Sequence, residues 1–386
     1  MLEIETTKAR SDAMSGRRHR NSNLELMRII LMLLVIAHHY VVNSGVSSNW
    51  TAGVYTSNAA LLIFYGMWGK ICINSFVMIT GYFMCKSRLT WMKVFKLIAE
   101  VYFWKLILTF VFAFSGCMGL KDIVSGLVFP FRGIGGGFTA SFIAMYLFIP
   151  FINRLLFALD KKSLLKLIGL LLFLFTFCTT FLASTTAFYE VGWYMTLYLV
   201  AAYIRLYPAR WMGDHKSATL FLVACVLTSV ASVAFLMLAS SVLGLGDHAY
   251  YFVVDSGKIM AALTGCAIFL FFNTLEIGYI PAINKIASTV FGVLLIHTNS
   301  DAMRKWLWQD VFNVSGLYQS CGIFELALAS VGIVLIVFCA CSALDMLRIV
   351  LFEKPLFKRI ADHKESIERN FMIRMSKLSG LFESYL

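Results

Sequence analysis

The sequence is poor in charged residues and in proline. Of its 386 residues, 14% are charged and 60% are hydrophobic, whereas soluble domains average about 25% charged and 45–50% apolar residues. Five prolines and no low-complexity tract argue against a disordered chain. A water-soluble protein of this length would need far more polar surface. We therefore expect the lipid bilayer to cover much of this protein.

The sequence also lacks cysteine pairs of the kind that bind zinc or form the disulfides of small secreted domains. The nine cysteines are scattered, mostly within apolar runs, and none forms a Cys-x-x-Cys pair. We interpret them as small buried apolar side chains and expect neither a metal site nor a disulfide framework. The formal charge of +12 could indicate nucleic acid, but its distribution along the chain indicates a membrane protein, and we expect no nucleic-acid partner.

Apolar segments run through nearly the whole chain. A bilayer core requires about 20 apolar residues per helix. The first run lacks a small-residue cleavage site behind it, so we interpret it as a retained helix and not as a signal peptide. The sequence predicts an all-α, polytopic integral membrane protein of about ten transmembrane helices, at 24–42, 59–84, 92–114, 138–156, 164–183, 192–207, 217–239, 253–273, 286–299 and 321–342.

Lysine and arginine are concentrated on one side of these predicted spans. That side holds 25 of the 33 basic residues, and an excess of basic residues marks the cytoplasmic side of a membrane protein. We therefore expect both termini to be cytoplasmic. Three regions follow from this topology: a basic N-terminal segment (1–23), a membrane domain (24–345) and a basic amphipathic tail (346–386). The tail either lies along the inner membrane face or is solvated.

Charged groups inside a bilayer are costly and mark functional candidates. Arg28 and His39, in the first predicted helix, are eleven residues apart, so they lie within about 20° of one face and about 16 Å apart along the axis. His38 points about 100° away from His39. Arginine suits phosphate and histidine suits proton transfer near neutral pH, so this stripe suggests one elongated ligand. Lys70 and Lys105 are more readily explained as ion-paired or snorkelling side chains.

Four segments of the chain resemble motifs of the membrane acyltransferase 3 family. Residues 28–39 resemble its Arg-x10-His motif, in the paired-histidine form (His38-His39) of surface-polysaccharide acetyltransferases. Residues 74–83 are similar to its Phe-x-x-Ser-Gly-Tyr-Phe stretch, with threonine in place of serine. Lys93-x-x-Lys96 is similar to its Arg-x-x-Arg, and residues 291–297 are similar to its Phe-Gly-Val-Tyr-Leu-Ile-His. The order of the segments along the chain matches that of the family.

The resemblance implies an enzyme, an O-acyltransferase of a bacterial cytoplasmic membrane. Its donor would be acyl-coenzyme A, usually acetyl-coenzyme A, and its carbohydrate acceptor a cell-surface or cell-wall polysaccharide or a lipid-linked precursor. We expect His39 and Arg28 to be catalytic, with His39 either a general base or the site of a covalent acyl group. Arg28, Lys93 and Lys96 would bind the phosphates of the donor. Further candidates for substrate binding are His38, Gly81, Tyr82 and His297, although Gly81 equally suits tight helix packing and His297 a structural hydrogen bond.

Two other classes of protein are compatible with this composition. A polysaccharide or lipid exporter would also have buried charges among many helices, but we find no internal repeat of the kind common in transporters. A polytopic scaffold without catalysis would not need a charged stripe on its first helix. Neither the acceptor sugar nor an oligomeric state follows from the sequence.

Overall fold

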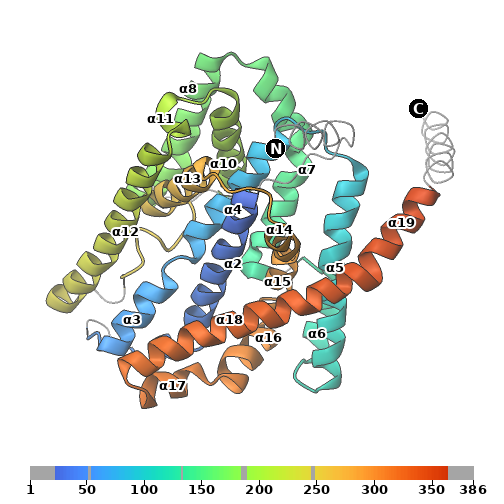
Figure 1. Ribbon diagram of the computed structural model, residues 1–386. Helices are drawn as coiled ribbons and strands as arrows, with labels where there is room; N and C mark the ends of the chain where they lie inside the picture. Colours follow the sequence, from blue (N-terminus) through green and yellow to red (C-terminus); the bar gives the residue numbers. More distant parts are fainter. Residues whose placement is uncertain (1–21, 51–53, 132–133, 184–188, 245–247, 364–386) are drawn as a thin grey trace, which may run out of the picture.

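The computed structural model describes residues 22–50, 54–131, 134–183, 189–244 and 248–363, which form a bundle of helices (Figure 1). Residues 1–21 of the basic N-terminal segment and the last part of the predicted tail, 364–386, lie outside the described residues. Helix α18 (Ile323–Arg348) continues through the π-helical segment η5 (Ile349–Glu353) into α19 (Lys354–Asp362). The beginning of the predicted tail is thus an extension of the last long helix.

Seven helical stretches of the described chain are long and apolar enough to cross a membrane. They coincide with seven of the predicted spans, so the prediction of an all-α, multi-pass membrane protein is confirmed. Three of them are not continuous α-helices: one has a break between α3 and α4, and the other two contain the π-helical segments η3 and η5. The seven are α2 (Ser22–Val42), α3 with α4 (Ser57–Gly66 and Gly69–Met84), α5 (Trp91–Phe114), α7 (Phe138–Ala158), α8 with η3 and α9 (Lys161–Leu172, Phe173–Phe177 and Cys178–Phe181), α12 (His215–Leu243), and α18 with η5 and α19.

The other three predicted spans are helical but do not meet this criterion. They are α10 (Tyr189–Leu206), α13 (Ile259–Thr274) and the pair α14 (Pro281–Ala287) and α15 (Val290–His297). Helix α10 packs against α4 and α7, α13 against α4 and α12, and α15 against α2, α5 and α18. Interior helices contact protein in place of lipid, so they can be shorter or less apolar than helices that face the bilayer. The number of membrane crossings and their orientation remain predictions.

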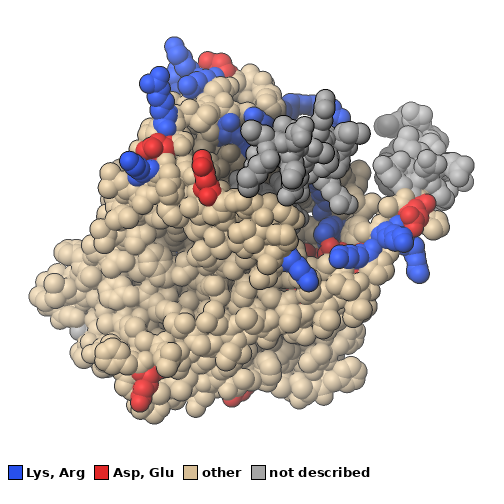
Figure 2. Space-filling view, in the orientation of Figure 1, with Lys and Arg blue, Asp and Glu red and all other residues tan. Residues whose placement is uncertain are grey.

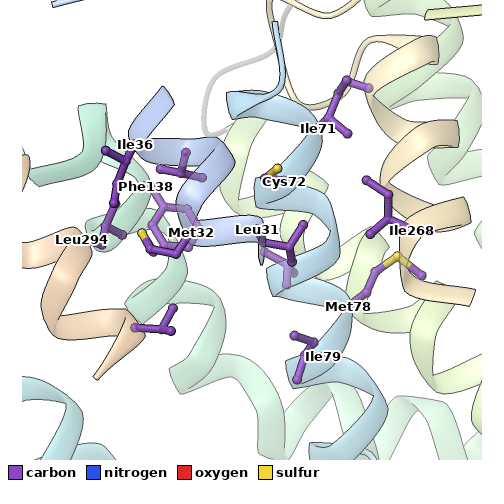
Figure 3. Packing of buried hydrophobic residues seen from close by; sticks show 14 of the residues in the cluster. Leu31, Met32, Ile36, Ile71, Cys72, Met78, Ile79, Phe138, Ile268 and Leu294 are labelled. Carbon is purple, nitrogen blue, oxygen red and sulfur yellow. The ribbon is translucent and has the colours of Figure 1, made fainter. Parts of the chain in front are cut away.

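Helix α2 is the central element of the fold. It packs against α3, α4, α14, α15 and α18, and Leu31 and Ile36 on it are fully buried. Figure 3 shows Met32 of α2 next to Phe138 of α7 and Leu294 of α15. Its first turn is anchored by side-chain oxygens: Ser22 accepts hydrogen bonds from Ile280 and Asn284, and Asn23 accepts one from Ile277. The α2 stripe is therefore held on several sides by neighbouring helices.

The remaining short helices are found in the connections. Several of them lie at the end of the bundle opposite to the beginning of α2 (Figure 1). Figure 2 shows that Lys and Arg side chains gather at the other end, where α2 begins; we call this the basic end. The short helices are η1 (Val46–Asn49), α6 (Leu120–Val128), η2 (Ile134–Gly137), α11 (Arg210–Gly213), α16 (Asp301–Lys305), η4 (Trp306–Val311) and α17 (Val314–Ser320).

Candidate active site

A cavity of about 1750 Å³ runs along α2 and is walled by α2, α4, α5, α7 and α15. Arg28 and Val42 both line it, and the helical rise puts their positions about 21 Å apart along α2. His39 lies on the same wall between them. The structure therefore brings the predicted stripe of Arg28 and His39 to one elongated cavity.

The part of the cavity wall at the basic end is positively charged. Three carboxylates also line this part: Glu25, Glu100 and Glu353. The six basic side chains there outnumber them, so the mouth favours an anionic ligand. These six are Arg28, Lys86, Lys93, Lys96, Arg205 and Lys354.

The three residues predicted to bind phosphate all line this mouth, and each also has a partner within the protein. Arg28 pairs with Glu25 at 3.3 Å and Lys96 with Glu353 at 2.5 Å. Lys93 donates hydrogen bonds to Ser87 Oγ at 2.8 Å and to a backbone carbonyl at 2.9 Å. Glu353 lies far from Lys96 in the chain, and nothing in the sequence pattern connects the two.

His39 forms a hydrogen-bonded pair with His297. The distance from Nδ1 of His39 to Nε2 of His297 is 3.0 Å, and Nδ1 of His297 lies 2.6 Å from the carbonyl oxygen of Val293. A carbonyl oxygen only accepts, so the Val293 contact requires a proton on Nδ1 of His297. The Nε2 atom of neutral His297 then accepts, and Nδ1–H of His39 donates to it. Nε2 of neutral His39 is left with its lone pair, as a general base requires.

His38 also lines the cavity, although helical periodicity turns it about 100° away from His39. Its Nδ1 donates to the carbonyl oxygen of Gly66 at 2.6 Å, and its ring centroid lies 5.5 Å from that of His39. The reason is the break between α3 and α4, which exposes the last carbonyls of α3. A Cβ atom on Gly69 would lie 2.3 Å from the His38 ring, so glycine allows the ring to fit there.

A family model described as an acyltransferase domain matches residues 21–346, from the beginning of α2 to near the end of α18. The chain belongs to the acyltransferase 3 family. No curated protein and no solved structure matches it. The protein is therefore a membrane acyltransferase, and the cavity along α2 is its candidate active site.

An aromatic ladder forms part of the cavity wall in this acyltransferase. Phe138, Phe142 and Tyr146 follow one another at four-residue spacing on α7, and all three line the cavity. The first two rings stack at 5.5 Å and 24°, and the next pair lies at 5.9 Å and 30°. Met32 and Val35 line the cavity from α2. The middle of the cavity is therefore apolar and suits an uncharged chain.

Polar groups return at the end of the cavity beyond His39. Lys70 on α4 pairs with Glu190 on α10 at 3.9 Å, and Ser141 donates to Glu190 at 3.0 Å. Asp301 and Arg304, which form an ion pair with each other, line the cavity at this end together with Lys70. We call this the polar far end. The short helix α16, which supplies Asp301 and Arg304, lies in the connection between the predicted spans 286–299 and 321–342.

The remaining predicted substrate-binding residues lie behind the cavity wall. A Cβ atom on Gly81 would lie 2.7 Å from the backbone of Tyr198, so Gly81 allows α4 and α10 to pack closely. The Tyr82 ring lies under the guanidinium of Arg205, at 4.3 Å. His297 is fully buried and contacts His39. Of the further candidates, His38 is the one whose side chain reaches the cavity wall within the described chain.

A buried ionic cluster joins α5 to the end of α18 beside the mouth. Arg348, 5% exposed, contacts Asp345 at 2.6 Å, Glu353 at 2.8 Å and Glu100 at 3.0 Å. The indole of Trp104 also donates to Asp345, at 2.8 Å. Through Glu353 the cluster extends to Lys96. It fixes one side of the cavity mouth.

No group of three or more His, Cys, Asp or Glu side chains is arranged to hold a metal ion in the part of the chain that the structure describes.

Proposed function

We propose that this acyltransferase transfers an acyl group, acetyl in the first instance, from acyl-coenzyme A to a hydroxyl group of a carbohydrate. The observation that carries this proposal is the state of His39. Its Nδ1 is engaged by His297, while its Nε2 has no partner among the described residues. This histidine lines a cavity whose mouth is basic and whose middle is apolar.

The donor matches the cavity in three parts. The phosphates of coenzyme A suit the basic mouth with Arg28, Lys93 and Lys96. The uncharged pantetheine arm suits the aromatic ladder and the apolar face of α2. Arg28 and His39 are about 16 Å apart along α2. A donor whose phosphates bind near Arg28 and whose arm follows α2 would therefore place its thioester near His39. We further propose that the basic end faces the cytoplasm of a bacterial cell, which supplies the donor.

The transfer step uses His39 as a general base and then as an acid. Nε2 of His39 takes the proton of the acceptor hydroxyl as its oxygen attacks the thioester carbonyl. The tetrahedral intermediate collapses, the carbon–sulfur bond breaks, and the thiolate of coenzyme A takes the proton back from His39. His297 keeps its hydrogen bond to Nδ1–H throughout and stabilises the imidazolium form. The products are the acyl ester and free coenzyme A.

The acceptor fits the polar far end. Lys70, Asp301 and Arg304 line it, and such side chains offer donors and acceptors to sugar hydroxyl groups. A cell-surface or cell-wall polysaccharide, or its lipid-linked precursor, has hydroxyl groups that could reach His39 from this side. The carbohydrate class rests on the family resemblance, and the far end supports it through its polar lining.

Purified protein in detergent or nanodiscs tests the proposal. Acetyl-coenzyme A is supplied with a panel of oligosaccharides, and release of free thiol is followed together with acetyl ester formation. We expect thiol release that depends on the acceptor and is lost in His39→Ala. An exporter, the competing class, would move carbohydrate across a vesicle membrane without releasing thiol from acetyl-coenzyme A, and that result would exclude acyl transfer.

A further inference from the structure

Arg205 is a cavity residue that no sequence motif singles out. It lies in the last turn of α10 and lines the basic mouth. Its guanidinium carbon is 4.3 Å from the centroid of the Tyr82 ring and 5.8 Å from that of Phe83. No carboxylate of the described chain lies within ion-pair distance of it, and its Nε is buried without a hydrogen-bond partner there.

Two other cations at the mouth are ion-paired, whereas Arg205 is not ion-paired among the described residues. Arg28 and Lys96 have carboxylate partners, Glu25 and Glu353, which offset part of their attraction for an anion. Arg205 is held by the faces of aromatic rings instead. The N–H groups of a guanidinium point outward in its plane. Stacking on a ring uses the face of the guanidinium, so these N–H groups remain available to a ligand.

The edge of a planar guanidinium matches a phosphate group, which can accept two parallel hydrogen bonds from it. A lysine at Lys93 or Lys96 presents a point charge and does not offer this geometry. We propose that Arg205 binds a phosphate of the coenzyme A donor, and that Tyr82 is the platform that positions it. This inference rests on the proposed donor. It places the bidentate phosphate contact on α10, whereas the sequence predicted phosphate contacts at Lys93 and Lys96, at the beginning of α5.

Two donors that share a thioester but differ in phosphate test the assignment. S-acetylpantetheine has the arm and the acetyl group of acetyl-coenzyme A but no nucleotide phosphates. A charge-assisted hydrogen bond contributes about 1.5–3 kcal/mol, or about 10- to 150-fold in affinity. We therefore expect Arg205→Gln to raise KM for acetyl-coenzyme A by about 10- to 150-fold and to leave the kinetics with S-acetylpantetheine unchanged.

Arg154→Gln is the matched control, because Arg154 lies near the end of α7 at the same end of the bundle, is exposed and does not line the cavity. Arg154→Gln should leave KM unchanged for both donors. Tyr82→Leu removes the platform and should raise KM for acetyl-coenzyme A alone, by less than Arg205→Gln. Activity with S-acetylpantetheine shows in each variant that the fold is intact.

Three results would overturn the inference. If Arg205→Gln raises KM equally for both donors, Arg205 supports the fold and not the phosphate. If wild type uses acetyl-coenzyme A while Arg205→Gln behaves like Arg154→Gln, Arg205 does not bind the donor and the proposed function stands. If wild type turns over neither donor, the proposed function fails first, and the assignment fails with it.

Discussion

Nδ1 of His39 lies 3.0 Å from Nε2 of His297, although the two residues are 258 positions apart in the chain. Because Nδ1–H of His297 is committed to the carbonyl of Val293, the pair has one consistent arrangement of protons in its neutral form. That arrangement leaves the lone pair on Nε2 of His39. In the mechanism that we propose, the buried His297 orients the pair and His39 is the open base.

Replacing His39 should affect turnover and leave donor binding intact. We expect His39→Ala to reduce acetyl transfer by about 10²-fold or more, the scale of a lost general base. His38→Ala should retain more activity, because the His38 ring is held by Gly66 and not by His297. Acetyl transfer kinetics together with titration calorimetry of acetyl-coenzyme A would measure both effects. Equal loss in the two variants would mean that both histidines take part in the chemistry.

Replacing His297 should lower kcat without changing KM for acetyl-coenzyme A. His297→Phe keeps a ring in the buried site but removes the acceptor for Nδ1–H of His39. A hydrogen bond to a charged group contributes about 1.5–3 kcal/mol, so we expect kcat to fall by about 10- to 150-fold. His297→Gln, whose side-chain oxygen can accept, should recover part of this loss. Similar kcat values for the Phe variant and wild type would rule out the orienting role.

Replacing Lys93 or Lys96 at the mouth should weaken binding of the donor and preserve turnover. Lys93→Ala and Lys96→Ala each remove a cation from the cavity wall, so KM for acetyl-coenzyme A should rise by up to about 150-fold with kcat mostly intact. Lys162→Ala, at an exposed position on α8, is the control and should have no effect. Donor affinity equal to wild type in both lysine variants would show that these lysines are only positive-inside anchors of α5.

Removing Arg348 should destabilise the protein. Arg348→Met leaves the buried carboxylates of Glu100 and Asp345, and the half-buried one of Glu353, without their shared cation. Breaking a buried pair in this way typically costs about 3–5 kcal/mol. We expect a clearly lower Tm in detergent, whereas Arg359→Met, at an exposed position of α19, should melt like wild type. An unchanged Tm for Arg348→Met would mean that the cluster adds nothing to stability.

Cysteine accessibility tests the orientation of the bundle. In a background with the exposed Cys117 and Cys339 replaced by serine, single cysteines are introduced at Ser48, Asp310 and Lys161, which are all exposed. A membrane-impermeant maleimide added to intact cells should label positions 48 and 310 and miss 161. Labelling at 161 alone would invert the predicted topology.

The class of the protein and much of its first helix follow from local properties of the sequence. Low charge and long apolar runs predict helices in lipid, and seven of them have the expected positions. The spacing of Arg28 and His39 places both on one stripe of α2 because helical periodicity depends only on residues close in sequence. The same periodicity separated His38 from this stripe, and here the tertiary structure differs: a break in a neighbouring helix widens the site to include both rings.

The partners of these residues depend on how helices pack. His39 meets His297, Lys96 meets Glu353, and Arg205 rests on Tyr82. Each contact joins elements that are distant in the chain, so no spacing rule relates the two residues. The sequence determined which side chains could bind phosphate or move a proton. Packing decided which of these side chains are paired with an opposite charge, which are oriented by a hydrogen bond and which remain open to a ligand. Ion pairs and hydrogen bonds form only where folding brings the two groups within a few ångströms.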